Sequence, residues 1–271
     1  MSWRKFSATV AGILLFLAAG CGQPGADSGE EILVLCGGSM RAALEEIIGQ
    51  YKEVEPDVNV LATYGGSGEL CAQIQNTGRG DLYLCHDPFM PWAHDQGLID
   101  EWKTVGGLDV VLIVPKGNPE NIEALEDLAE PGVRVGIGNQ TYSTSGQIVK
   151  HLFRELDYGD QILENVRVET KGHQQRCNDV VMGTLDAALV WNAVAHLYKD
   201  RVEIMPVPTE KLDAITTATY DKLDLSKTKV TMGIIAGSAE RPAVQDFYEF
   251  ATSRGLLVFR EKGFLPPDRV K

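Results

Sequence analysis

Residues 32–39, with the sequence ILVLCGGS, hold the pattern on which the predicted fold depends. Their four leading apolar residues indicate a buried strand, and apolar residues then recur at helical spacing from Ala43 to Tyr51. The same order of strand and helix returns from Val58 to Gln75 and again from Asp81 to Gln96. Strands that alternate with helices through short glycine-bearing turns are typical of parallel βαβ units. We therefore predict an α/β fold.

A second series of the same kind follows the apolar run from Leu108 to Val114 and its turn formers PKGNP. In this series we expect strands at 134–137, 187–190, 202–207 and 228–235, and helices at 122–128, 145–153, 174–182 and 242–252. Two lobes, each a mainly parallel sheet flanked by helices, fit the chain better than one long sheet.

The first of the expected lobes is built from two separate segments of the chain. We expect residues 31–110 together with 230–271 to form lobe 1, and residues 111–229 to form lobe 2. The chain then crosses twice between the lobes, near Asp109 to Val111 and near Lys229 to Met232. Such paired crossings are typical of a hinge on which two lobes close.

The N-terminal segment has the layout of a secretory signal. A positively charged start precedes an uncharged run at 6–20 that is too short for a transmembrane helix, so we expect residues 1–20 to be removed. The sequence LAAGC at 17–21 resembles the lipobox of bacterial lipoproteins, which implies that Cys21 is lipidated. Residues 21–30 then form a flexible tether. An ordinary cleaved signal with an incidental cysteine is the alternative.

The chain is strongly acidic, with a formal net charge of -13 at pH 7. Loss of the expected signal removes Arg4 and Lys5 and no acidic residue, so the mature chain is more acidic still. We therefore expect no nucleic-acid partner, and no contact with the membrane except through the lipid anchor. The surface charge does not exclude an anionic ligand, because locally aimed dipoles outweigh a distant, salt-screened field.

Serine and glycine recur where a predicted strand ends and a helix begins. The junctions are CGGS at 36–39, GGSG at 65–68 and the segment from Gly138 to Gly146. A helix N-terminus offers unpaired backbone N–H groups and a partial positive charge, and serine adds a hydroxyl donor. In parallel sheets these junctions meet at one edge, where ligands bind. The serines either line a neutral anion site or simply cap their helices, since serine is a preferred N-cap.

These junctions belong to motifs that resemble the periplasmic molybdate- and tungstate-binding proteins. The motifs are LCGGSM at 35–40, YGGSG at 64–68, GDLYL at 80–84, VPKGNP at 114–119 and KGF at 262–264. The likeness covers essentially the whole mature chain. It implies the two-lobed type II fold of periplasmic binding proteins, an oxyanion held by neutral hydrogen bonds, and the permease of an ABC importer as partner.

The resemblance also assigns roles to individual residues. The implied oxyanion contacts are Ser39, Ser67, Ser145, Trp191 and either His173 or Gln174. The first two contribute side chains of the first lobe, whereas Ser145 and the residue at 173 or 174 contribute backbone N–H groups of the second. Trp191 stands where the family has a ligand-binding tyrosine, and an indole offers one N–H donor but no hydroxyl. Molybdate or tungstate is the anion expected first.

Four cysteines lie beyond the lipobox: Cys36, Cys71, Cys85 and Cys177. An even number in an exported protein suggests disulfides, and Cys36 with Cys85 is the first pairing expected, because their strands are predicted neighbours. Buried core thiols are a second interpretation. Since all four are predicted near the cleft, a thiol site is a third. The alternative function is then a binding protein or sensor for arsenite or a soft metal ion.

No catalytic motif supports an enzyme. GGSGE at 65–69 lacks the last glycine of the G-x-S-x-G elbow, and the sequence holds no P-loop, dinucleotide fingerprint or H-E-x-x-H motif. We expect an extracytoplasmic, lipid-anchored solute-binding protein that acts as a monomer without a metal or other cofactor and delivers its anion to an importer.

Overall fold

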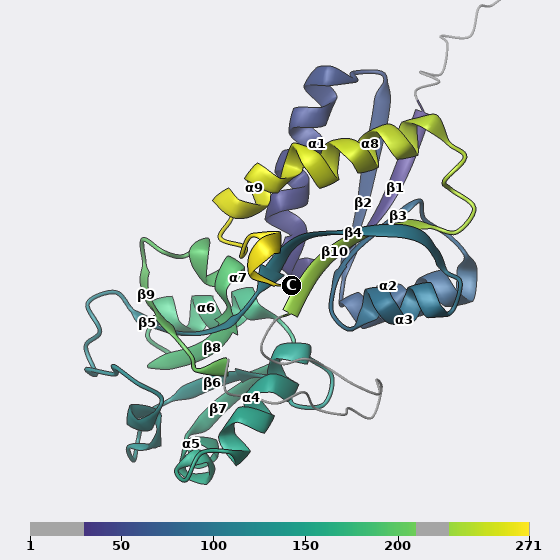
Figure 1. The fold of residues 1–271 in the computed structure, drawn as a ribbon. Coiled ribbons are helices and arrows are strands. Elements are labelled where there is room, and N and C mark those ends of the chain that lie inside the picture. The colour runs from purple at the N-terminus through teal and green to yellow at the C-terminus, as the bar shows by residue number, and fades with distance from the viewer. Residues whose placement is uncertain (1–29, 210–227, 271) are drawn as a thin grey trace, which may run out of the picture.

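The computed structural model describes residues 30–209 and 228–270 (Figure 1). The expected signal, Cys21 and almost all of the tether lie outside these ranges, as do residues 210–227 and 271. Two five-stranded sheets, each flanked by helices, form two lobes. The predicted α/β class and two-lobed fold are confirmed. Within the described ranges, no helix combines the length and the apolar character that a membrane span requires.

The sheet of the first lobe has the strand order β2-β1-β3-β10-β4. Its strands are β1 (Glu30–Gly37), β2 (Val58–Gly65), β3 (Leu82–His86), β4 (Ile99–Leu108) and β10 (Thr228–Ile235). β1 pairs in parallel with β2 and β3, and β10 runs antiparallel to β3 and β4. Four strands therefore share one direction. The ends of β1, β2 and β3 meet at a single edge of the sheet.

Helices cover both faces of this sheet. They are η1 (Gly38–Met40), α1 (Arg41–Val54), α2 (Ser67–Thr77), α3 (Phe89–Asp95), α8 (Pro242–Ser253), α9 (Gly255–Glu261) and η4 (Pro267–Arg269). Figure 1 shows α1, α8 and α9 on one face and α2 and α3 on the other. Successive residues of a strand point to opposite faces, so Val34 packs on the α1 side and Leu35 on the α2 side. Because both layers bury β1, its sequence is an apolar run without alternation.

The second lobe repeats this arrangement with the strand order β7-β6-β8-β5-β9. Its strands are β5 (Val110–Pro115), β6 (Val135–Gly138), β7 (Val166–Thr170), β8 (Ala187–Trp191) and β9 (Val202–Pro206). Its helices are η2 (Glu126–Ala129), α4 (Thr144–Arg154), α5 (Gly159–Glu164), α6 (His173–Val181) and α7 (Asn192–His196). β6 pairs in parallel with β7 and β8, and β5 runs antiparallel to β8 and β9.

Asp109 joins the two lobes between β4 and β5. Its backbone N–H donates to Asn192 Oδ1 and its carbonyl accepts from the Asn192 N–H, both at 2.9 Å. The carboxylate also accepts from Thr209 Oγ1 at 2.7 Å. These contacts fix the position of Asp109, the single residue between β4 and β5. Asp109 is one of the residues named for the first predicted crossing, and Val110, which is expected in lobe 1, pairs with Trp191 in the second sheet.

The residues named for the second predicted crossing lie inside a strand of the first sheet. Lys229 and Met232 lie inside β10, where they pair with Gly107 and Lys103 of β4. Thr228 and Lys229 thus belong to the first lobe, two residues earlier than expected. The strand expected at 228–235 therefore forms, and it lies between β3 and β4 in the first sheet.

The helix expected at 122–128 also differs from the structure. Only a short 3-10 helix, Glu126–Ala129, forms there. Asp127 Oδ2 accepts from the backbone N–H groups of Glu123 and Ala124, at 2.7 and 2.9 Å, and Asn118 bonds to both backbone groups of Ile122. These side chains take the backbone bonds that a helix would need, which is why apolar spacing alone misleads here.

Candidate functional site

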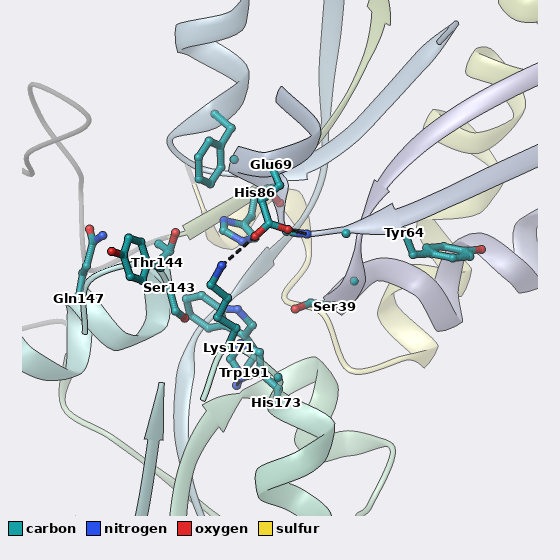
Figure 2. Close-up of a pocket in the computed structure, with 18 of the residues that line it drawn as sticks. Ser39, Tyr64, Glu69, His86, Ser143, Thr144, Gln147, Lys171, His173 and Trp191 are labelled. Carbon is teal, nitrogen blue, oxygen red and sulfur yellow. Dashed lines mark hydrogen bonds and ion pairs between the residues drawn. The ribbon is translucent and has the colours of Figure 1, made fainter. Parts of the chain in front are cut away.

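A cavity of about 820 Å³ lies between the lobes, at the edge where the parallel strands of both sheets end (Figure 2). The first lobe contributes the starts of η1 and α2 and the end of β3 to its wall. The second lobe contributes the starts of α4 and α6 and the end of β8. Of the predicted contacts, Ser39, Ser67, Trp191 and both His173 and Gln174 line this cavity, whereas Ser145 does not.

Ser67 is the first residue of α2, and its side chain does not cap the helix. The N-cap is Gly66, whose backbone N–H donates to Glu69 Oε2 at 3.4 Å. The Ser67 hydroxyl is buried and has no hydrogen-bond partner among the described residues. It lies so close to Gly37 that a Cβ at that position would stand 2.6 Å from the oxygen. A buried hydroxyl without a partner costs free energy, so a ligand oxygen that accepts its proton would recover this cost.

Ser39 occupies the middle of η1, directly after β1. It is half-buried and lines the cavity, and the helix start has no side-chain cap. Figure 2 shows it on the first-lobe side of the cavity, below and to the right of Glu69 in this view. For Ser39 and Ser67, the capping interpretation is therefore wrong. Both hydroxyls belong to the wall of the cavity.

The third serine junction behaves differently. Ser143, which the sequence analysis did not single out, is the N-cap of α4 and accepts from the Gly146 N–H at 3.5 Å. The Ser145 hydroxyl is buried and contacts Ser143 Oγ at 3.0 Å and His173 Nε2 at 3.5 Å. Ser143 and Thr144, rather than Ser145, line the cavity. Ser143 directly precedes the first residue of α4, which is the position that N-cap serines prefer.

His173 opens α6 and is held as a neutral ring with a defined tautomer. Its Nδ1 accepts from the Trp191 backbone N–H at 3.2 Å and from Arg176 Nη2 at 3.0 Å, so the ring proton is on Nε2. Burial, with the positive charge of Arg176, holds the pKa of His173 well below its usual value. The ring therefore acts as an N–H donor on the Ser145 side of the cavity wall.

Trp191 ends β8 and forms the floor between two imidazoles. It is 1% exposed, stacks on His173 with centroids 5.6 Å apart, and meets His86 edge to face at 5.9 Å. His86 Nδ1 donates to the Asp87 carbonyl at 2.7 Å, which leaves Nε2 as an acceptor. Burial lowers the pKa of His86, so it too is neutral. The wall thus holds one imidazole donor and one imidazole acceptor.

Among the described residues, two cationic side chains line the cavity, and each is already paired. Lys171 Nζ of the second lobe contacts Glu69 Oε1 of the first at 2.8 Å, the dashed line in Figure 2. Arg41 Nε contacts Glu45 Oε1 at 2.8 Å, and its guanidinium lies 4.7 Å from the Tyr64 ring centroid. The hydrogen-bond donors that remain on the wall are therefore mainly neutral.

The four cysteines beyond the lipobox are free and buried, and none lines the cavity. The disulfide expected between Cys36 and Cys85 is wrong. Cys36 pairs with Leu84 across β1 and β3, so Cys85, one residue further, points to the opposite face of the sheet. Burial raises the pKa of every one of these thiols, to about 11 for Cys71 and about 12 for Cys177. The core-thiol interpretation fits this burial, whereas a thiol ligand site does not.

Metal binding by side chains has no support from the geometry. Among residues 30–209 and 228–270, no group of three or more histidine, cysteine, aspartate or glutamate side chains is placed to hold an ion. His86 and His173 are engaged through their Nδ1 atoms, on either side of Trp191. A soft-metal function therefore lacks a site in the described part of the chain.

The two lobes and the donor-lined cavity between them define a two-lobed binding protein. Residues 32–265 match the family of bacterial extracellular solute-binding proteins. Because this match covers most of the chain, the protein belongs to that family. Membership implies an extracytoplasmic location, and the homologues are binding proteins rather than enzymes.

Individual relatives agree with this assignment. The chain is 27% identical to a Bacillus subtilis protein, provisionally assigned as an ABC transporter substrate-binding lipoprotein, over 97% of this chain and 98% of that protein. It is 25% identical to the molybdate-binding protein of Mycobacterium tuberculosis, over 70% of this chain and 76% of that protein. The periplasmic molybdate-binding protein of Azotobacter vinelandii has the same fold, with a TM-score of 0.68 at 19% identity, covering 87% of this chain and 99% of that one. The resemblance to molybdate-binding proteins is confirmed.

Proposed function

We propose that this chain is the binding component of an ABC importer, anchored to the membrane through Cys21, and that it holds a tetrahedral oxyanion between its lobes. Molybdate and tungstate are the first expected ligands. The observation that carries this proposal is the buried Ser67 hydroxyl, which has no partner among the described residues and stands in a wall of neutral donors. The likeness to a molybdate-binding protein supports the choice of anion.

Both lobes offer donors to such an anion. The hydroxyls of Ser39 and Ser67 come from the first lobe, and the ring N–H of His173 and the backbone at Gln174 come from the second. Three of these groups stand at helix starts, where unpaired N–H groups and the helix dipole favour negative charge. Since Lys171 and Arg41 are paired with carboxylates, neutral donors would carry most of the binding.

The size of the cavity supports closure of the lobes on the ligand. A space of about 820 Å³ is larger than one tetrahedral oxyanion, so tight contact from both sides requires the lobes to approach or water to remain. The crossing at Asp109 is the natural pivot, because a single residue joins β4 to β5 there. The closed lobes would then present a joint surface to the permease.

Calorimetric titration of the mature chain tests this function. The ligand panel is molybdate, tungstate, sulfate, phosphate and arsenite. Tight binding of molybdate or tungstate, unchanged after thiol alkylation, supports the proposal. Binding of arsenite alone, lost after alkylation, would replace it with the thiol-based function, and no binding of any member would remove the oxyanion proposal.

The lipid anchor needs a separate test, because Cys21 lies outside the described residues. In a bacterial host, we expect the wild-type chain to fractionate with membranes and to carry metabolically incorporated palmitate. Cys21→Ala should appear in the soluble extracytoplasmic fraction without label. A Cys36→Ala control, which changes a buried core thiol, should stay with the membranes. Equal fractionation of Cys21→Ala and wild type would rule out the anchor.

A further inference from the structure

Arg176, in the first turns of α6, is a buried cation that has no anionic partner among residues 30–209 and 228–270. Its side chain is 0% exposed. All of its hydrogen bonds go to neutral groups: the Leu189 carbonyl at 3.2 Å, the Thr170 carbonyl at 2.8 Å, Thr170 Oγ1 at 3.1 Å and His173 Nδ1 at 3.0 Å. Within the described ranges, no carboxylate forms an ion pair with its guanidinium or perturbs it.

A buried charge of this kind is costly to maintain. In proteins, the free-energy cost of burying a cation is offset by an ion pair or by many hydrogen bonds. Among the described residues, Arg176 has only hydrogen bonds. Burial lowers the pKa of Arg176 to about 10, so the guanidinium still carries its charge at neutral pH. The second lobe thus holds an uncompensated positive charge directly behind the cavity wall.

A chain of hydrogen bonds connects this charge to the cavity. Arg176 Nη2 donates to His173 Nδ1, and the opposite nitrogen of the same ring carries the proton that lies toward Ser145 Oγ. Ser145 Oγ in turn contacts Ser143 Oγ at 3.0 Å, and Ser143 and His173 both line the cavity. Figure 2 shows His173 beside Trp191 on the second-lobe side of the cavity, below the Lys171 and Glu69 pair. A cation bonded to one side of an imidazole polarises the N–H on the other side, because hydrogen bonds in a chain strengthen one another.

We infer that Arg176 is the buried counter-charge of the bound anion and acts through the Nε2–H of His173, so that the site selects doubly charged anions over singly charged anions of the same shape. This inference rests on the proposed oxyanion function. It assigns selectivity to a residue that does not touch the ligand, and it explains how neutral wall donors can favour a dianion in a strongly acidic protein. Neither Arg176 nor this relay follows from the serine junctions.

The test compares tungstate with perrhenate, two tetrahedral oxyanions of nearly equal size that carry two charges and one. A Coulomb energy is proportional to the charge of the ligand. Loss of the Arg176 charge should therefore raise the Kd for tungstate by a factor that is about the square of the factor for perrhenate. If Arg176→Gln weakens perrhenate roughly tenfold, tungstate should weaken roughly a hundredfold. Arg176→Lys, which keeps the charge, should restore part of the preference for tungstate.

Arg167→Gln is the matched control, because it removes one exposed cation from the same lobe without lining the cavity. It should leave both affinities unchanged. If Arg176→Gln does not fold, His173→Phe tests the relay instead, since it keeps a ring on Trp191 and the Arg176 charge but removes the Nε2–H; tungstate binding should then weaken by a larger factor than perrhenate binding. Equal losses for the two anions, in whichever variant folds, would reduce Arg176 to a structural role.

The wild-type protein separates this inference from the function on which it rests. Tungstate binding with a clear preference over perrhenate supports both. Equal affinity for the two anions would overturn the counter-charge role and leave the oxyanion function standing. Failure to bind any tetrahedral oxyanion would overturn the proposed function and the counter-charge role together.

Discussion

Replacing Ser67 by alanine should weaken ligand binding and strengthen folding at the same time. A hydrogen bond to a charged partner contributes about 1.5–3 kcal/mol, so loss of the hydroxyl should raise the Kd for the cognate oxyanion roughly 10- to 160-fold. The same hydroxyl is buried without a hydrogen-bond partner in the described part of the chain. Its removal should therefore raise the free energy of unfolding by about 1 kcal/mol, at the lower end of the cost of such a group.

Calorimetric titration measures the first effect, and thermal unfolding without ligand measures the second. For a chain of this size, 1 kcal/mol corresponds to an increase in Tm of roughly 2–4 °C. Ser238→Ala is the matched control, because Ser238 is also buried but donates to Asp81 Oδ1 at 3.1 Å, away from the cavity. It should lower Tm and leave the Kd unchanged. A Ser67→Ala protein that binds like the wild type and is less stable would refute this account of Ser67.

The remaining predictions concern protons, the contact between lobes and the thiols. Burial lowers the folded-state pKa values of His86 and His173, so the unfolded chain binds protons at a higher pH than the folded chain does. The free energy of unfolding should therefore be constant above about pH 6.5 and decline below it. Measuring Tm as a function of pH would check this. A flat Tm between pH 7 and 5 would contradict the neutral rings. Lys171→Met should change the unfolding free energy by no more than about 1 kcal/mol, because both partners of its pair with Glu69 are mostly exposed, but small-angle scattering should show a larger share of open lobes. The four buried thiols should resist alkylation in the native protein and react after denaturation, and rapid native labelling would place a thiol at the surface.

Much of the fold follows from the sequence because the central strands are buried on both faces. The ILVL run at β1 and the run at 228–235 match strands closely, since continuous apolar runs bounded by turn formers have few other interpretations. β4, by contrast, mixes exposed polar residues with two glycines, and its pairing with β10 depends on contacts more than a hundred residues apart. A short stretch of sequence gives no information about pairing with a strand so far along the chain.

The residues of the candidate site also fall into those that the sequence predicts and those that it does not. Ser39 and Ser67 are predictable because a strand end, a glycine and a helix start put them at one edge of the sheet. Ser143, His86 and Arg176 are not, because their roles depend on which atom faces the cavity and which is already bonded. The error over Cys36 and Cys85 has a related cause. Neighbouring strands suggest proximity, but the register of the pair decides the face, and only the structure supplies the register.

The most direct measurement is the anomalous scattering of tungsten in crystals grown with tungstate. The account predicts one strong tungsten position in the cleft, with oxygens within hydrogen-bond distance of the Ser39 and Ser67 hydroxyls and of His173 on the opposite lobe. Tungsten found only on the outer surface, or a cleft that stays without it at concentrations that saturate the protein in solution, would contradict the account.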